Sequence, residues 1–92
     1  MNKLCALLGR SEVRDLVDVR ALLAKGGDLV RALTDAREKD SGFSPLTLVW
    51  LLRSLAVETL APLEGHSKAE TGELVAFRDD LVSGLATLAV AE

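Results

Sequence analysis

The residues that could do chemistry gather near the beginning of the chain, where Lys3, Arg10, Arg14, Asp15 and Asp18 follow one another. If the backbone were one continuous helix, positions 3, 10, 14 and 18 would lie along a single face. An ammonium group and guanidinium forks suit phosphate oxygens, so this face predicts a nucleotide or phosphate site. The alternative is structural, because Arg14 and Asp18 stand at the spacing of an ordinary helical ion pair. Spacing alone favours the structural interpretation.

The other reactive side chains are isolated. His66 is the only histidine, and we expect it in a solvated loop rather than at a metal. Cys5 is the only cysteine, and its apolar neighbours favour a buried thiol in a reducing compartment. Asp79 and Asp80 diverge by about 100° if helical, so they cannot chelate one ion. Trp50 is expected in the core rather than as a platform for a base. No metal site is therefore predicted, and no serine has a histidine partner for hydrolysis.

Composition limits the class of protein. Hydrophobic residues make up 49% of the 92 positions and aromatic residues only 3%. Leu, Val and Ala supply the apolar mass, and Leu and Ala favour helix. So much apolar surface in a short chain hints at a face covered by a partner. The net charge of −3 gives no broad basic field, so direct nucleic-acid binding is not expected. Neither a membrane span nor a signal peptide is recognisable, and we expect a cytoplasmic protein.

Capping residues and glycines divide the chain into about five expected helices. Asp28 can cap the third helix, and Ser44 precedes a proline suited to a first helical position. Ser67 and Glu70 stand at capping-box spacing. The helices are expected at residues 2–8, 12–25 and 29–39, from Pro45 to a break marked by Pro62 and Gly65, and from the Ser67 cap to about Val90. The fourth helix is apolar on nearly all sides and should be central. The fold class predicted is all-α, a compact bundle in one domain over residues 1–92, without a sheet.

The run from Lys3 to Val19 resembles the third motif of the AbiEii/AbiGii nucleotidyltransferase-like toxin family. That motif has a Lys, then Ala-Leu, then Arg, then Arg-Asp followed by an Asp and apolar residues. Its charged positions correspond to Lys3, Arg10, Arg14, Asp15 and Asp18. Residues 39–45 and 77–79 also resemble the C-terminal region of that family. The resemblance implies a helical lobe that follows a palm domain, in which the Lys contacts phosphates and the Arg-Asp…Asp group supports the nucleotide site.

The resemblance also implies parts that this sequence lacks. In the family, the palm supplies a Gly-Ser-type nucleotide-binding turn and a pair of carboxylates for Mg²⁺. Here Ser41-Gly42 falls in a predicted loop between helices, and no suitable carboxylate pair is found. Without a metal pair, nothing stabilises phosphoryl transfer. We therefore expect no cofactor for the chain alone, with Mg²⁺ and an NTP binding only if a separate palm completes the site.

The sequence thus predicts the C-terminal lobe of a bacterial AbiEii-like nucleotidyltransferase toxin, catalytically incomplete by itself. The start at Met1, directly before the motif, favours a truncated reading frame or a chain cut there. The alternative is a free-standing helical interaction or regulatory module, such as an antitoxin-like partner. The expected partner is a separately encoded palm or a second copy of the chain, bound through the first helix and part of the fourth or last helix. No membrane contact is expected.

Overall fold

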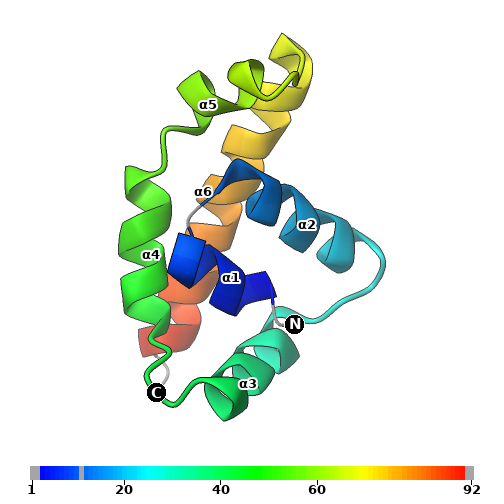
Figure 1. Cartoon of the computed structure of the whole chain (residues 1–92). Coiled ribbons are helices and arrows are strands. Elements are labelled where there is room, and N and C mark those ends of the chain that lie inside the picture. The colour runs from blue at the N-terminus through cyan, green and yellow to red at the C-terminus, as the bar shows by residue number, and fades with distance from the viewer. Residues whose placement is uncertain (1–2, 11, 91–92) are drawn as a thin grey trace.

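The computed structural model describes residues 3–10 and 12–90, and of Lys3 and Arg10 it describes only the backbone. This part of the chain forms six α-helices and contains no strand, so the all-α prediction is confirmed (Figure 1). The helices are α1 (Lys3–Arg10), α2 (Val13–Ala24), α3 (Leu29–Lys39), α4 (Pro45–Ser54), α5 (Val57–Leu63) and α6 (Lys68–Val90). The radius of gyration of 12.6 Å is close to the value of about 12 Å expected for a compact chain of this length.

The short helix α1 lies inside the bundle. It packs against α2, α3 and α4, and it places Leu4 and Leu7 in the core. A helix of 8 residues is marginal in water, so these contacts with its own chain are what keep it folded. Gly9 does not end α1, which continues to Arg10 before α2 starts at Val13. This break separates the candidate residues into two helices, so the continuous face considered from the spacing does not form.

Side-chain caps set the starts of three helices, as the sequence indicates. Asp28 accepts a hydrogen bond from the Val30 N–H at 3.0 Å, and the Ser44 hydroxyl accepts one from the Thr47 N–H at 3.4 Å. At α6 the capping box is complete: the Ser67 N–H donates to Glu70 Oε1 at 2.9 Å, and the Glu70 N–H donates to the Ser67 hydroxyl at 3.1 Å. Hydrogen bonding by Ser67, that of its backbone N–H above all, lowers the pKa of Glu70.

The fourth expected helix is divided into α4 and α5. α4 ends at Ser54, and α5 starts at Val57 after a bend of 69°, which is why the chain has one helix more than expected. Pro62 lies inside α5, one residue before its end, instead of between helices. No single helix in the described ranges is long and apolar enough to cross a membrane; only the bent α4–α5 pair passes that test together, by length and composition.

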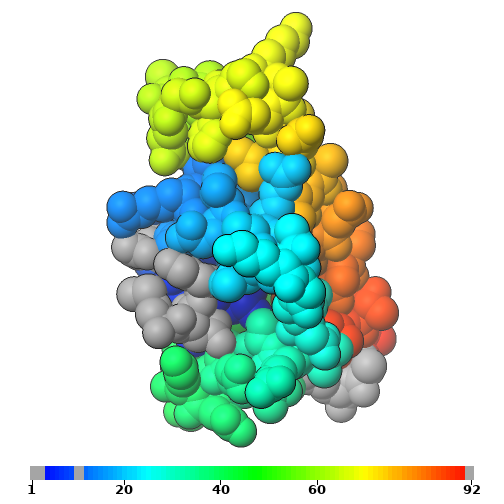
Figure 2. All heavy atoms as spheres, turned by 90° about the vertical axis from the view of Figure 1, so that its right-hand side faces the viewer, coloured from blue at the N-terminus to red at the C-terminus, as the bar shows by residue number. Residues whose placement is uncertain are grey.

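The longest helix, α6, contacts three of the other helices along its length. Its 23 residues pack against α2, α4 and α5 and bury Leu74, Leu81 and Leu85. Figure 2 shows α2 across the middle of one face, α3 below it and α6 along one side. Near the end of α6, a Cβ on Gly84 would lie 3.2 Å from Leu29 Cδ2, so this glycine lets the start of α3 approach closely.

The expectation that α4 is central proves wrong for one of its faces. Leu48 and Leu52 are buried against the bundle, but Leu46 is 60% exposed and Trp50 is 68% exposed. The physical reason is that α4 lies at the edge, where α1 and α6 cover it and the opposite stripe faces solvent (Figure 1). Trp50 is therefore not the core residue that its size suggests.

Candidate functional site

The candidate residues lie on two neighbouring helices. Lys3 and Arg10 are the first and last residues of α1, and their side chains fall outside the described part of the chain. Arg14, Asp15 and Asp18 belong to the first half of α2, which packs against α1. The fold therefore brings the two elements together, although they are not one helix.

Arg14 points to solvent and forms an ion pair with Glu12. Its side chain is 63% exposed, and its Nε lies 2.8 Å from Glu12 Oε2. Glu12 has an extended backbone as the N-cap of α2, so its side chain can reach a residue only two positions away. The partner of Arg14 is thus Glu12, instead of the Asp18 that the helical spacing suggests. An exposed pair of this kind contributes little stability and exchanges partners easily.

Asp15 lies in the core, although its neighbour Arg14 is exposed. Its relative exposure is 0%, among Val13 and Leu16, which are also buried. Successive helical side chains diverge by about 100°, so one faces inward where the other faces out. Asp18 is half-buried. A carboxylate buried like Asp15 costs free energy unless it is held by polar contacts, and it is not accessible to a ligand in solvent.

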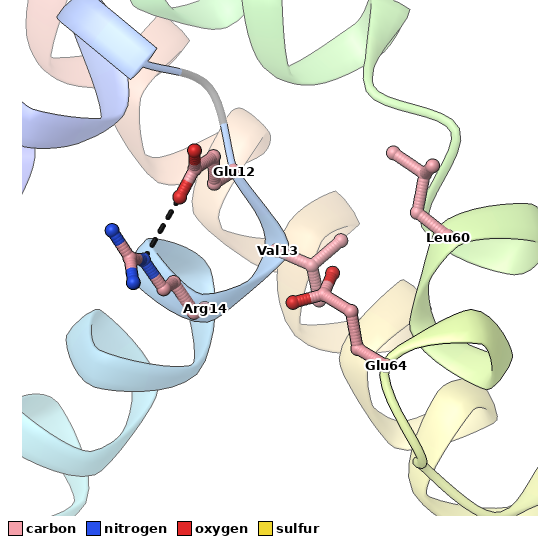
Figure 3. A pocket seen from close by; sticks show the side chains of 5 residues that line it. All are labelled: Glu12, Val13, Arg14, Leu60 and Glu64. Atoms are coloured by element: carbon pink, nitrogen blue, oxygen red, sulfur yellow. Dashed lines mark ion pairs between the residues drawn. The ribbon is translucent and has the colours of Figure 1, made fainter.

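An open cavity of about 370 Å³ lies beside Arg14, between the start of α2 and α5. Its lining comprises Glu12, Val13, Arg14, Leu60 and Glu64. Figure 3 shows the paired Glu12 and Arg14 on one side, Leu60 and Glu64 on the other, and Val13 between them. Sequence reasoning missed this cavity, because no pattern in the chain connects the two segments that form it.

The charges of the cavity favour a cation over a phosphate. Glu12 and Arg14 neutralise each other, while Glu64 has no ion-pair partner among the residues that the structure describes. Val13 and Leu60 add apolar atoms to the lining beside this carboxylate. A cationic group with an apolar stem fits this chemistry best.

The Mg²⁺ that nucleotide transfer implies does not fit the described residues. Within residues 3–10 and 12–90, no three His, Cys, Asp or Glu side chains lie close enough together to hold a metal ion. Asp79 and Asp80 are both exposed on α6, and Asp79 Oδ1 is engaged by Arg78 at 3.1 Å. Cys5 lies half-buried with its Sγ 3.7 Å from the Ala36 carbonyl oxygen.

Arg78 joins three elements at the bend between α4 and α5, a role that the sequence does not indicate. Its side chain is 13% exposed, and its Nη1 donates to the Leu55 carbonyl at 3.0 Å, just beyond the end of α4. Its Nη2 lies 3.3 Å from Glu58 Oε1 in the first turn of α5. A cation at the C-terminal end of a helix also suits the helix dipole. Arg78 therefore fixes the bend from α6.

Comparison with known protein families gives a match over almost the whole chain. The family model described as "Nucleotidyl transferase AbiEii toxin, Type IV TA system" matches residues 1–90. Neither the curated proteins nor the solved structures give a match. The family match runs from α1 to the end of α6, so it extends far beyond the first motif, on which the sequence resemblance mainly rests.

Proposed function

Because the chain belongs to the AbiEii nucleotidyltransferase toxin family, we propose that it is the helical C-terminal lobe of such an enzyme, completed by a palm that lies outside these residues. One observation carries the proposal: the family match spans residues 1–90, while the described residues are all-helical and gather no metal ligands. The palm must then supply the carboxylates for Mg²⁺, which would stabilise the charge that develops during transfer. We place this bacterial lobe in the cytoplasm.

Within the lobe, the cations and the carboxylates of the candidate set have different roles. Lys3, Arg10 and Arg14 contact the phosphates of the nucleotide, and Arg14 is able to do so because its exposed pair with Glu12 costs little to break. Asp15 is a packing residue that holds α2 in the core beside α1. The phosphates would approach Arg14 from solvent, at the edge of the cavity that Arg14 helps to line.

Transfer assays test whether the lobe is incomplete. The purified chain is incubated with Mg²⁺ and each radiolabelled NTP, together with RNA and protein acceptors. We expect no labelled acceptor. Transfer that disappears in Arg14→Ala and persists in Arg31→Ala would show instead that the chain is an enzyme by itself. Arg31 is a suitable control because it is an exposed arginine on α3, outside the motif.

A titration of the labelled chain with ATP, followed by the backbone amide signals, tests the phosphate contacts. We expect shifts concentrated in residues 3–18 and binding weakened about tenfold in Arg14→Ala, because a charge-assisted contact is lost. Arg31→Ala should bind as the wild type does. Equal binding by both variants would contradict the role given to Arg14.

A second candidate is the free-standing interaction or regulatory module. The large apolar side chains exposed on α4 and α5 favour it, since Leu46, Trp50 and Leu63 are 60%, 68% and 78% exposed. Leu46 and Trp50 lie one turn apart on α4, and neighbouring exposed apolar residues mark interaction surfaces in many proteins. This candidate predicts that no palm restores transfer, whereas the lobe becomes active when a family palm is added.

A further inference from the structure

One stripe of α4 combines two exposed apolar side chains with a cation. Leu46, Trp50 and Arg53 follow at spacings of four and three residues, which places them on one face of the helix. Leu46 is 60% and Trp50 68% exposed, and Arg53 is exposed without an ion-pair partner among the described side chains. Tryptophan and arginine are the residue types most enriched among those that dominate binding energy at protein interfaces.

α5 and the cavity beside it combine exposed apolar side chains with an acid, which complements the apolar and cationic stripe of α4. Leu63 is 78% exposed, and Leu60 lines the open cavity whose inner wall is Val13. Glu64 stands at the end of α5 and contributes to that cavity a carboxylate without an ion-pair partner in the part of the chain that the structure describes. An apolar stem that ends in a cation would therefore meet both an apolar wall and an unneutralised acid there.

We infer that these two surfaces bind each other in a two-fold dimer of this chain. The α4 stripe of one copy packs against α5 of the other, and Arg53 enters the cavity beside Glu64. In a two-fold arrangement the contact occurs twice, so each copy contributes both surfaces. Charge complementarity supports a second copy as the occupant, because the chain itself carries the cation beside Trp50 and the acid beside Leu63, neither with an ion-pair partner in the described ranges.

The placement of the elements agrees with this interface. α4 and α5 follow each other along one edge of the molecule (Figure 1). The first helix, expected at a dimer interface from the sequence, has its large side chains Leu4 and Leu7 in the core of its own chain, so α4 and α5 take its place. Arg14 lines the same cavity as Glu64, but the dimer variants change other residues and are read out by association, so either proposal can fail without the other.

Complementary charge reversals test the pairing. Arg53→Glu places two acids opposite each other at both contacts, and Glu64→Arg places two cations there. Both side chains are exposed, so the variants should fold, which circular dichroism checks. Sedimentation equilibrium at tens of micromolar should show a wild-type dimer and association weakened about tenfold or more in each variant.

Mixing the two variants is the decisive measurement. In a mixed dimer, the introduced acid at position 53 faces the introduced cation at position 64 at one contact, and the native Arg53 faces the native Glu64 at the other. Association should therefore return to near the wild-type level. A monomeric wild type, a dimer that tolerates either reversal, or a mixture that stays monomeric overturns the inference. A monomeric wild type would mean that the α4 stripe binds a palm or another partner instead of a second copy.

A second pair of variants tests the apolar part of the contact. We expect Trp50→Ala to weaken the dimer about tenfold or more, because a large exposed indole at the centre of the stripe loses its burial against the second copy. Leu22→Ala should leave the dimer unchanged, since Leu22 is 53% exposed on α2, outside both surfaces. Equal weakening by the two variants would overturn the assignment of the interface to α4.

Discussion

The start of α2 and the outer face of α4 differ in which kind of side chain they bury. α2 buries the carboxylate of Asp15 completely, whereas α4 leaves the indole of Trp50 68% exposed. α2 is in contact with α1, α5 and α6, while α4 is covered by α1 and α6 and lies at the edge. Each helix buries four residues, so burial here depends on which face of the helix a side chain lies on, and residue polarity follows it only loosely.

The largest effect that tests this comparison is expected at Asp15. Asp15→Ala removes a fully buried side chain and leaves a cavity in the core, and we expect a loss of about 3 kcal/mol in the free energy of unfolding. Arg14→Ala, one residue away but exposed, should change it by less than about 0.5 kcal/mol. Urea unfolding followed by circular dichroism measures both. Similar losses in the two variants would show that Asp15 is not an anchor of the core.

A smaller effect is expected at the bend between α4 and α5. Arg78→Ala removes the donor to the Leu55 carbonyl and the partner of Glu58, at an expected cost of about 1–2 kcal/mol. Arg78→Lys keeps the positive charge but lacks the several N–H donors of the guanidinium group, so its stability should lie between those of Arg78→Ala and the wild type. Thermal unfolding at matched protein concentration provides the comparison. If Arg78→Ala unfolds at the same temperature as the wild type, the bend is held by packing alone.

The capping box should add a modest stability that depends on pH. Hydrogen bonds from the Ser67 N–H and hydroxyl lower the pKa of Glu70 from 4.5, so the ionised form favours the folded state. The contribution of Glu70 to stability is complete above pH 4.5, the pKa of this carboxyl without these bonds. It is lost as the pH falls through the lower pKa that Glu70 has in the folded state. Wild type should therefore be more stable than Glu70→Gln at pH 7, and the difference should vanish in acid. A difference that stays constant as the solution is acidified would contradict the shift.

The smallest effect is expected for Trp50. In the monomer, at concentrations where no dimer forms, Trp50→Ala should alter the free energy of unfolding by less than about 0.5 kcal/mol, because the indole has few contacts in its own chain. The matched change Leu48→Ala, on the buried face of α4, should cost about 3 kcal/mol. A large loss for Trp50→Ala in dilute solution would mean that the indole belongs to the core.

The sequence predicts the local features of this fold well and the tertiary features poorly. The caps at Asp28, Ser44 and Ser67 are found at the expected helix starts, because each depends only on residues two or three positions away. The bend after Ser54 was missed, since Arg78 secures it from a distant helix. For the same reason, the spacing of the charged residues gave no indication that Asp15 is buried.

The order of the helices along the chain has a consequence for folding during synthesis. α6 comes last of the described helices, yet it is the element on which α2, α4 and α5 pack. Helices of 8, 10 and 7 residues, such as α1, α4 and α5, are marginal in water on their own. A nascent chain that has emerged only as far as α5 therefore lacks the partner for most of its apolar faces. The core should therefore be completed only after α6 has left the ribosome.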